Sequence, residues 1–130
     1  MERSKIPVPE RPSYSETKKK LDLARKKVSQ NDWAPVDPTK LLKDFETLDL
    51  WTLEEESMTL LIALAEIKPE NYAGGRPPQR SFEEICRGAE LFAFTWSSTY
   101  FGCQMYLKFC FVKQSLYIVS FHESRSPERR

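Results

Sequence analysis

Three side chains near the C-terminal end of the sequence are suited to proton transfer and phosphate binding. They are Tyr106, Lys108 and His122, the only histidine of the chain. A histidine has an ordinary pKa of about 6.5, so it can accept or release a proton near neutral pH. A lysine supplies a positive charge, and a tyrosine hydroxyl can donate a hydrogen bond or a proton. Together these groups fit the cleavage of RNA, whose 2′-hydroxyl is a built-in nucleophile.

Each residue has one or two expected roles in such a reaction. His122 is the general acid or the general base, and Lys108 neutralises charge on the phosphate. Tyr106 either positions the phosphate or shares the proton transfer. The residues expected to bind RNA are Gln104, on the same strand face, and three polar side chains of the glycine- and proline-rich segment 68–80: Arg76, Gln79 and Arg80.

These residues meet only if the last two strands pair in one register. A three-residue loop at 113–115 places Tyr106 opposite His122, whereas a two-residue loop places Tyr106 opposite Phe121. The three-residue register also pairs 112 with 116, 109 with 119, 108 with 120 and 107 with 121. In this register every cross-strand pair is expected to match in character, so hydrophobic pairing favours it. It also assigns Leu116 and Ile118 to the polar face, and the turn contains no glycine.

The elements before this hairpin are predicted to be helices. A capping box of Ser13 and Glu16 starts a helix over 14–29, with an apolar stripe of Tyr14, Leu21, Ala24 and Val28. The segment "NDWAPVDP" ends it. Asp37 caps the next helix, Pro38 is its first residue, and its stripe is Leu41, Leu42, Phe45 and Leu48. A box of Thr52 and Glu55 precedes the most apolar helix, Met58 to Ile67. Ser81 and Glu84 start a short helix to about Arg87.

From residue 90 onward the apolar pattern has a period of two, which is typical of strands. Phe92, Phe94 and Trp96 share one side, and Trp96 is expected in the core. Helices followed by an antiparallel meander indicate an α+β fold, with the helices packed on one sheet face. We expect one domain over 1–130, with a loose arm at 1–12, a mainly helical part at 13–89, the meander at 90–123 and a tail at 124–130.

Composition restricts the class of protein further. No apolar run approaches the roughly 20 residues of a membrane-spanning helix, and the first residues contain no hydrophobic signal core. The three cysteines lack metal-ligand spacing, which favours reduced thiols in a cytoplasmic protein and predicts no cofactor. Residues 1–28 carry a net charge of +5, residues 29–70 of −7 and residues 71–130 of +3. The basic ends either flank a polyanion or are solvated helix faces.

The hairpin sequence "MYLKFCFVKQSLYIVSFHES" resembles the C-terminal hairpin of the motility quorum-sensing regulator toxin family. Tyr106-Leu107-Lys108 and Ile118-Val119-Ser120-Phe121-His122-Glu123 carry the resemblance. It implies a bacterial endoribonuclease of RelE-like fold, which cleaves messenger RNA without a metal, with or without the ribosome. It also implies a cognate antitoxin protein as a partner. Tyr106 stands at the family's active-site tyrosine, and His122 stands where the family usually has a catalytic lysine.

Two other functions are compatible with the sequence. The chain could be a non-catalytic module, related to these toxins, that binds RNA or a protein. It could also be a small regulatory domain whose interface is the acidic segment 29–70. The family's Trp-Gln pair is Trp96-Ser97 in this chain, and its remaining lysine and glutamine have no counterpart by sequence.

Overall fold

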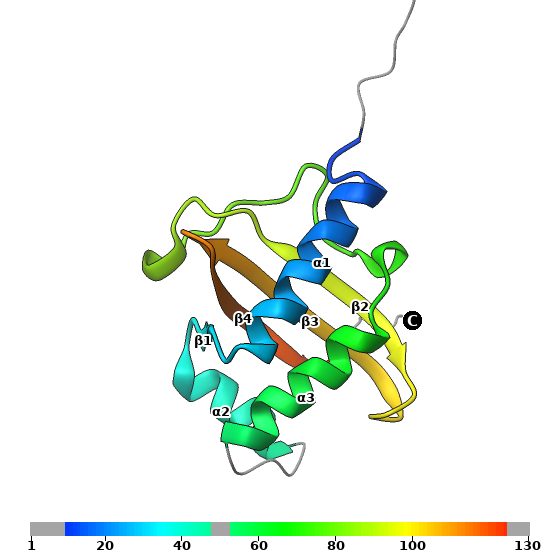
Figure 1. Ribbon diagram of the computed structural model, residues 1–130, viewed down its shortest axis with the longest axis vertical. Coiled ribbons are helices and arrows are strands. Elements are labelled where there is room, and N and C mark those ends of the chain that lie inside the picture. The colour runs from blue at the N-terminus through cyan, green and yellow to red at the C-terminus, as the bar shows by residue number, and fades with distance from the viewer. Residues whose placement is uncertain (1–9, 48–52, 125–130) are drawn as a thin grey trace, which may run out of the picture.

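The computed structural model describes residues 10–47 and 53–124, with no side-chain placement for 53–55. The fold is α+β, as predicted: three N-terminal helices are followed by a four-stranded, mostly antiparallel sheet (Figure 1). The helices are α1 (Tyr14–Ser29), α2 (Pro38–Thr47) and α3 (Leu53–Glu66), with single 3₁₀ turns η1 (Pro69–Asn71) and η2 (Glu84–Cys86). The strands are β1 (Trp33–Pro35), β2 (Phe92–Ser98), β3 (Cys103–Val112) and β4 (Ser115–Glu123), in the spatial order β1-β4-β3-β2.

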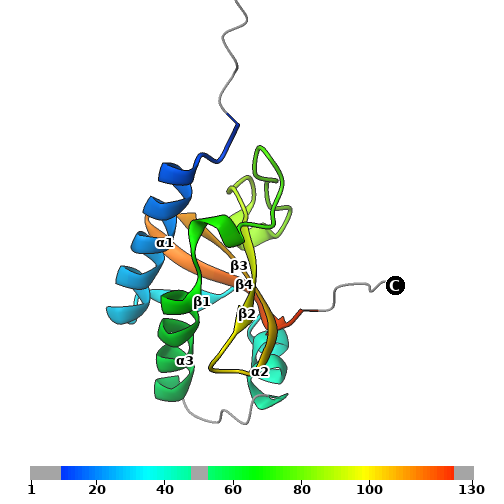
Figure 2. The same cartoon turned by 90° about the vertical axis from the view of Figure 1, so that its right-hand side faces the viewer.

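The sheet has a helical side and an opposite side. Helices α1 and α3 lie on one face, whereas the irregular segment between η1 and β2 lies on the other (Figure 2). Helix α2 contacts β4, where the rings of Phe45 and Phe121 are 5.7 Å apart. We call the sheet surface opposite α1 and α3 the outer face.

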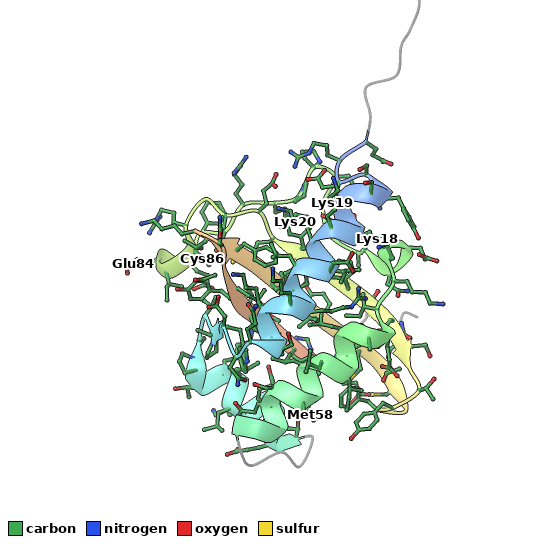
Figure 3. All side chains as sticks on the ribbon, in the orientation of Figure 1. Lys18, Lys19, Lys20, Met58, Glu84 and Cys86 are labelled. Atoms are coloured by element: carbon green, nitrogen blue, oxygen red, sulfur yellow. The ribbon has the colours of Figure 1, made fainter. Side chains whose placement is uncertain are left out.

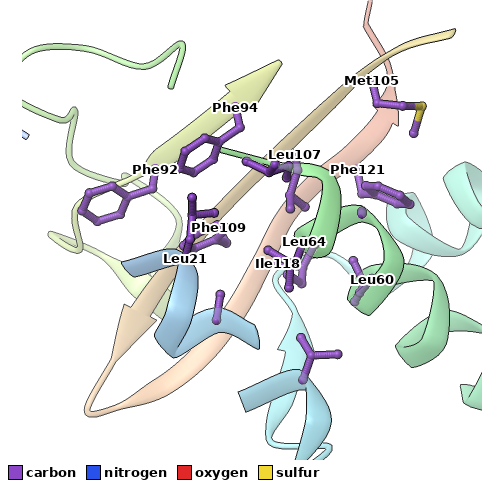
Figure 4. Packing of buried hydrophobic residues seen from close by; sticks show 14 of the residues in the cluster. Leu21, Leu60, Leu64, Phe92, Phe94, Met105, Leu107, Phe109, Ile118 and Phe121 are labelled. Atoms are coloured by element: carbon purple, nitrogen blue, oxygen red, sulfur yellow. The ribbon is translucent and has the colours of Figure 1, made fainter. Parts of the chain in front are cut away.

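The hydrophobic core lies between the sheet and α1 and α3 (Figure 4). The aromatic rings of β2 and β3 stack within it, with Phe94 and Phe109 at 5.7 Å between centroids. Phe92, Phe94 and Trp96 are all buried, which confirms their predicted common side. Side chains shown in Figure 4 include Leu21, Leu60, Leu64, Phe92, Phe94, Met105, Leu107, Phe109, Ile118 and Phe121.

The apolar stripes of the helices are narrower than predicted. Tyr14 in α1 and Leu42 in α2 are exposed, and Met58 is 59% exposed at the surface of α3 (Figure 3). The apolar helix is therefore not buried all round, because only one of its sides meets the core. The predicted positions Leu48 and Thr52 lie outside the described residues.

Helix α1 begins at the predicted cap, but the capping box is only half formed. The Ser13 hydroxyl accepts a hydrogen bond from the Glu16 amide at 3.1 Å. The Glu16 carboxylate binds Arg11 instead of turning back to the cap, and Arg11 also forms an ion pair with Glu90 at 3.1 Å. Pro12 is buried. The prediction of a loose arm is therefore wrong for residues 11 and 12, since these contacts hold them against α1.

The segment after α1 contains a strand that the sequence analysis missed. Trp33–Pro35 forms β1, which pairs in parallel with Leu116–Ile118. Its proline is compatible with this position because β1 is an edge strand, where a missing N–H need not break a ladder. The cap of α2 is as predicted, with the Lys40 amide donating to Asp37 Oδ1 at 3.1 Å.

The β3–β4 hairpin reaches the predicted partners by a different route. Its turn has two residues, Lys113 and Gln114, both in the left-handed region with φ of 51° and 73°. Val112 therefore pairs with Ser115 rather than with Leu116. A β-bulge at Lys108/Phe109 then shifts the register by one residue.

Beyond the bulge the predicted pairs are present. Tyr106 pairs with His122, Leu107 with Phe121 and Lys108 with Ser120. Before it, Phe109 pairs with Ile118 instead of Val119. Leu116 and Ile118 consequently lie in the core, so their predicted place on the polar face is wrong. Because the bulge absorbs one extra residue of β4, the apolar residues before it and those after it both face the core.

Candidate functional site

Tyr106 and His122 form the centre of the candidate site on the outer face. They are cross-strand partners, and their rings stack with centroids 5.3 Å apart and planes inclined by 25°. Burial raises the pKa of Tyr106 above its ordinary value. The phenol therefore stays protonated at neutral pH and can act as a hydrogen-bond or proton donor.

The His122 ring is oriented by the backbone. Its Nδ1 lies 2.8 Å from the carbonyl oxygen of Glu123. Since a carbonyl oxygen can only accept, Nδ1–H is the donor. This contact leaves Nε2 as the nitrogen that is unprotonated in the neutral ring and able to accept a proton.

Two lysines bring positive charge next to this pair. Lys108 follows Tyr106 on the same face and pairs with Ser120. The Lys40 ammonium, from α2, donates to the Ser120 hydroxyl at 3.2 Å. No ion pair with a carboxylate holds Lys40 or Lys108 within the described part of the chain. Both ammonium groups are therefore available to a bound anion.

The segment 79–91 covers part of the outer face. This part of the sheet is therefore not an open polar surface that faces solvent. Backbone hydrogen bonds close this segment on itself, from the Leu91 amide to Gln79 O at 2.8 Å and from the Ser81 amide to Ala89 O at 2.9 Å. Its turn η2 contacts β3. Cys86 lies nearer the sheet than Glu84 does (Figure 3), and it is buried. Burial, with a hydrogen bond to Cys86, raises the pKa of Cys110 on β3.

The predicted Ser81–Glu84 capping box does not form. The Ser81 hydroxyl accepts from the Glu83 amide at 3.0 Å and lies 3.2 Å from Cys86 Sγ. The segment is a single 3₁₀ turn rather than a helix to Arg87. Ser81 thus stabilises a compact loop instead of starting a helix.

Two adjacent cavities connect this segment with the strands. Gln79, Leu91 and Lys108 line both of them. The smaller cavity, of about 170 Å³, contains Tyr106 and backbone of the glycine-rich turn, and the larger, of about 720 Å³, contains Phe82. The full lining of the larger cavity is Gln79, Arg80, Ser81, Phe82, Glu83, Leu91, Lys108 and Val119. Lys108 is the cationic residue that they share.

The four residues expected to bind RNA are placed differently from one another. Gln79 lines both cavities and Arg80 lines the larger, although one Arg80 nitrogen donates to the Gly88 carbonyl at 2.8 Å. Arg76 is directed elsewhere: it donates to Pro12 O at 3.0 Å, and its guanidinium lies 4.9 Å from the centre of the Tyr72 ring. Arg76 therefore holds the glycine-rich loop against the N-terminal segment.

Gln104, Trp96 and Tyr100 line neither of the two cavities. Gln104 is exposed on β3, beyond Tyr106. Trp96 is buried, as predicted, and its ring N–H donates to Glu66 at 2.9 Å. Tyr100 is exposed near the β2–β3 turn.

Two residues of the site had not been predicted. Lys40 gave no sequence signal, because it is one of several lysines on helix surfaces. Phe82 is 89% exposed although it is a large apolar residue. Its position next to the charged Glu83 and Glu84, in a segment with no regular apolar period, was the available clue.

The described residues contain no group of three or more His, Cys, Asp or Glu side chains arranged to hold a metal ion. Their three cysteines are free thiols. None of the described helices is both long and apolar enough to cross a membrane.

Comparisons with protein-family models, with curated proteins and with solved structures gave no match.

Proposed function

We propose that this protein is a metal-independent endoribonuclease of RelE-like fold, the toxin of a type II toxin–antitoxin system. The observation that carries the proposal is the stacked Tyr106–His122 pair, with Lys108 and the Lys40–Ser120 contact beside it. A proton acceptor, a proton donor and neighbouring cations are groups that promote cleavage of an RNA phosphodiester.

The chemistry assigns one proton to each member of the pair. His122 Nε2 takes the proton of the ribose 2′-hydroxyl while that oxygen forms a bond to phosphorus. The bond from phosphorus to the 5′-oxygen breaks, and this oxygen takes the Tyr106 hydroxyl proton. The products are a 2′,3′-cyclic phosphate and a 5′-hydroxyl. Solvent then returns the proton to Tyr106 and accepts the one held by His122.

Lys108 and Lys40 neutralise the phosphate during this reaction. Charge builds up on its non-bridging oxygens in the transition state, where preorganised cations stabilise it most. The Ser120 hydroxyl accepts a hydrogen bond from the Lys40 ammonium at 3.2 Å and so holds it in place. Ser120 itself is the cross-strand partner of Lys108. The substrate is messenger RNA, and a cognate antitoxin protein would neutralise the enzyme by covering the outer face.

The proposal is tested by incubating the purified chain with total RNA in the presence of EDTA, and by expressing it in bacteria. Wild type should fragment RNA and arrest growth, and His122→Ala and Tyr106→Phe should do neither. Glu123→Gln, an exposed neighbour whose contact to His122 uses only its backbone, is the matched control and should behave as wild type. Intact RNA with wild type, together with undiminished toxicity of His122→Ala, would refute the proposal. Binding of RNA without cleavage would identify a non-catalytic RNA-binding module instead.

A further inference from the structure

We infer that Phe82 is a base-stacking residue, and that the ligand of the outer face is a single-stranded RNA segment with one nucleobase on this ring. The inference rests on the proposed function only in taking RNA as the ligand. It adds a binding subsite, and the strandedness of the substrate, to the groups that perform the cleavage.

Phe82 is exposed within a loop whose backbone is well fixed. Its ring is 89% exposed. The flanking backbone is closed by bonds between residues 81 and 89 and between 79 and 91, and by the Ser81 hydroxyl. An aromatic side chain that could gain stability by burial is instead presented to solvent on a closed loop. Because Phe82 also lines the larger cavity, a ligand bound there can reach the exposed ring.

The surroundings of Phe82 favour a nucleotide over a purely apolar ligand. Five of the eight residues that line the larger cavity are polar or charged, and Arg80 and Lys108 give it two cationic residues against the single carboxylate of Glu83. Leu91 and Val119 are the other two apolar residues of the lining. Its volume of about 720 Å³ lies within the range of roughly 300–1,000 Å³ common for small-ligand sites. One aromatic ring among cations matches the stacking platforms with which proteins hold unpaired bases.

The two cavities define a path for the strand. Tyr106 lies in the smaller cavity, Phe82 lies in the larger, and Lys108 lines both. A phosphate at Lys108 would therefore place one flank of the RNA at the Tyr106–His122 pair and the other at Phe82. Bases in a duplex are stacked on each other and cannot lie on a protein ring, so this path requires single-stranded RNA.

A protein partner would use the loop in another way. Ile85, three residues further on, is 50% exposed and is the second large apolar residue of the loop. It does not line the cavity beside Lys108. Docking of a protein would be expected to bury both apolar side chains, whereas stacking of a base needs Phe82 alone. This difference makes Ile85 the matched control.

The test measures binding of a mixed-sequence 2′-O-methyl RNA strand, which has no free 2′-hydroxyl and cannot be cut by the proposed chemistry. Phe82→Ala should weaken binding about 5- to 150-fold, which corresponds to the roughly 1–3 kcal/mol that base–aromatic stacking contributes. Phe82→Leu should weaken it similarly because it retains an apolar surface but no π-face, and Phe82→Trp should bind as well as wild type or better. Ile85→Ala should bind as wild type.

The position of the stacked base can be mapped with the same variants. Strands carrying one abasic site each are compared on wild type and on Phe82→Ala. An abasic site at the position of the stacked base should weaken binding to wild type, but it should not weaken binding to Phe82→Ala any further.

The outcomes separate this inference from the cleavage proposal. Wild-type binding that Phe82→Ala leaves unchanged would overturn the inference and leave the nuclease assignment standing. Loss on Phe82→Ala but not on Phe82→Leu would also overturn it, since a merely apolar contact would then suffice. Absence of wild-type binding would overturn the inference, whereas the nuclease assignment is decided by the cleavage assay with unmodified RNA. Phe82-dependent binding by a chain that cuts no RNA would support the inference and contradict the proposed activity. Thermal melting of each variant confirms that the fold is retained.

Discussion

Tyr106 and His122 lie opposite each other on β3 and β4, with ring centroids 5.3 Å apart and planes inclined by 25°. The β-bulge produces this arrangement, because the two-residue turn alone would pair Tyr106 with the apolar Phe121. The bulge displaces β4 by one residue and brings its last residues into the register in which polar side chains meet. Bulges are frequent next to functional sites, where they redirect side chains.

The proposed proton roles predict a selective rescue of Tyr106→Phe. A substrate in which sulfur replaces the 5′ leaving oxygen needs no acid, because a thiolate leaves readily without a proton. This RNA should restore cleavage by Tyr106→Phe to near the wild-type rate and should not rescue His122→Ala, which still lacks the base. Single-turnover rates on both substrates measure the effect. Equal rescue of both variants would show that the roles are assigned wrongly.

The two lysines predict a change in the salt dependence of RNA binding. Lys40→Ala and Lys108→Ala should each lower the slope of log affinity against log salt by about 0.7, the value for one phosphate contact on a single strand. Lys43→Ala, an exposed lysine on the same helix as Lys40, is the control and should leave the slope unchanged. A slope that changes equally for Lys40→Ala and Lys43→Ala would mean that Lys40 contributes only to overall charge.

The hairpin turn predicts a stabilising double substitution. Lys113 and Gln114 have φ of 51° and 73°, a left-handed conformation that costs an ordinary residue about 1–2 kcal/mol. Asn-Gly is the preferred pair in two-residue turns of this kind. Lys113→Asn combined with Gln114→Gly should raise the free energy of unfolding by about 1 kcal/mol, measured by urea denaturation. Lys113→Ala should give no such gain, and a loss of stability in the double variant would contradict the assigned turn.

Cys110 predicts a loss of stability at alkaline pH. Burial and its contact with Cys86 raise its pKa above 9.0. Below pH 9.0 the thiol is protonated in both the folded and the unfolded chain. Above it the unfolded chain ionises first, so the contribution to stability falls as the pH rises toward the folded pKa. Cys110→Ala should show a shallower decline of the urea midpoint between pH 8 and pH 11 than wild type, and an equally steep decline would contradict this account.

Much of the fold and part of the site follow from local patterns in the sequence. The cap at Ser13 and the alternation of Phe92, Phe94 and Trp96 are signals carried by neighbouring residues, and both are confirmed. The pairing of Tyr106 with His122 could be predicted because matching of the apolar residues Leu107 and Phe121 fixes the register of the pair beside it. The two-residue turn and the bulge could not be predicted. The bulge compensates for the shorter turn, so the residue pattern reveals only the net register of the two strands.

The remaining parts of the site depend on tertiary contacts. Lys40 reaches Ser120 across 80 positions of the chain, and no local pattern marks that contact. Arg76 was expected near RNA because of its loop, but the buried Pro12 and the Tyr72 ring hold its side chain elsewhere. The short β1 was missed because three residues with a proline do not show a period of two.

The most direct test of the central claim is an analysis of the ends of the RNA that the protein produces. Wild type in EDTA should yield fragments with a 2′,3′-cyclic phosphate at one end and a 5′-hydroxyl at the other. A 2′-deoxy substitution at a mapped scissile nucleotide should abolish cleavage there, and His122→Ala should lower the rate by at least about 100-fold, the contribution of a general acid or base. Fragments with 5′-phosphate ends, or cleavage that continues at the 2′-deoxy position, would show that the outer face does not perform this reaction.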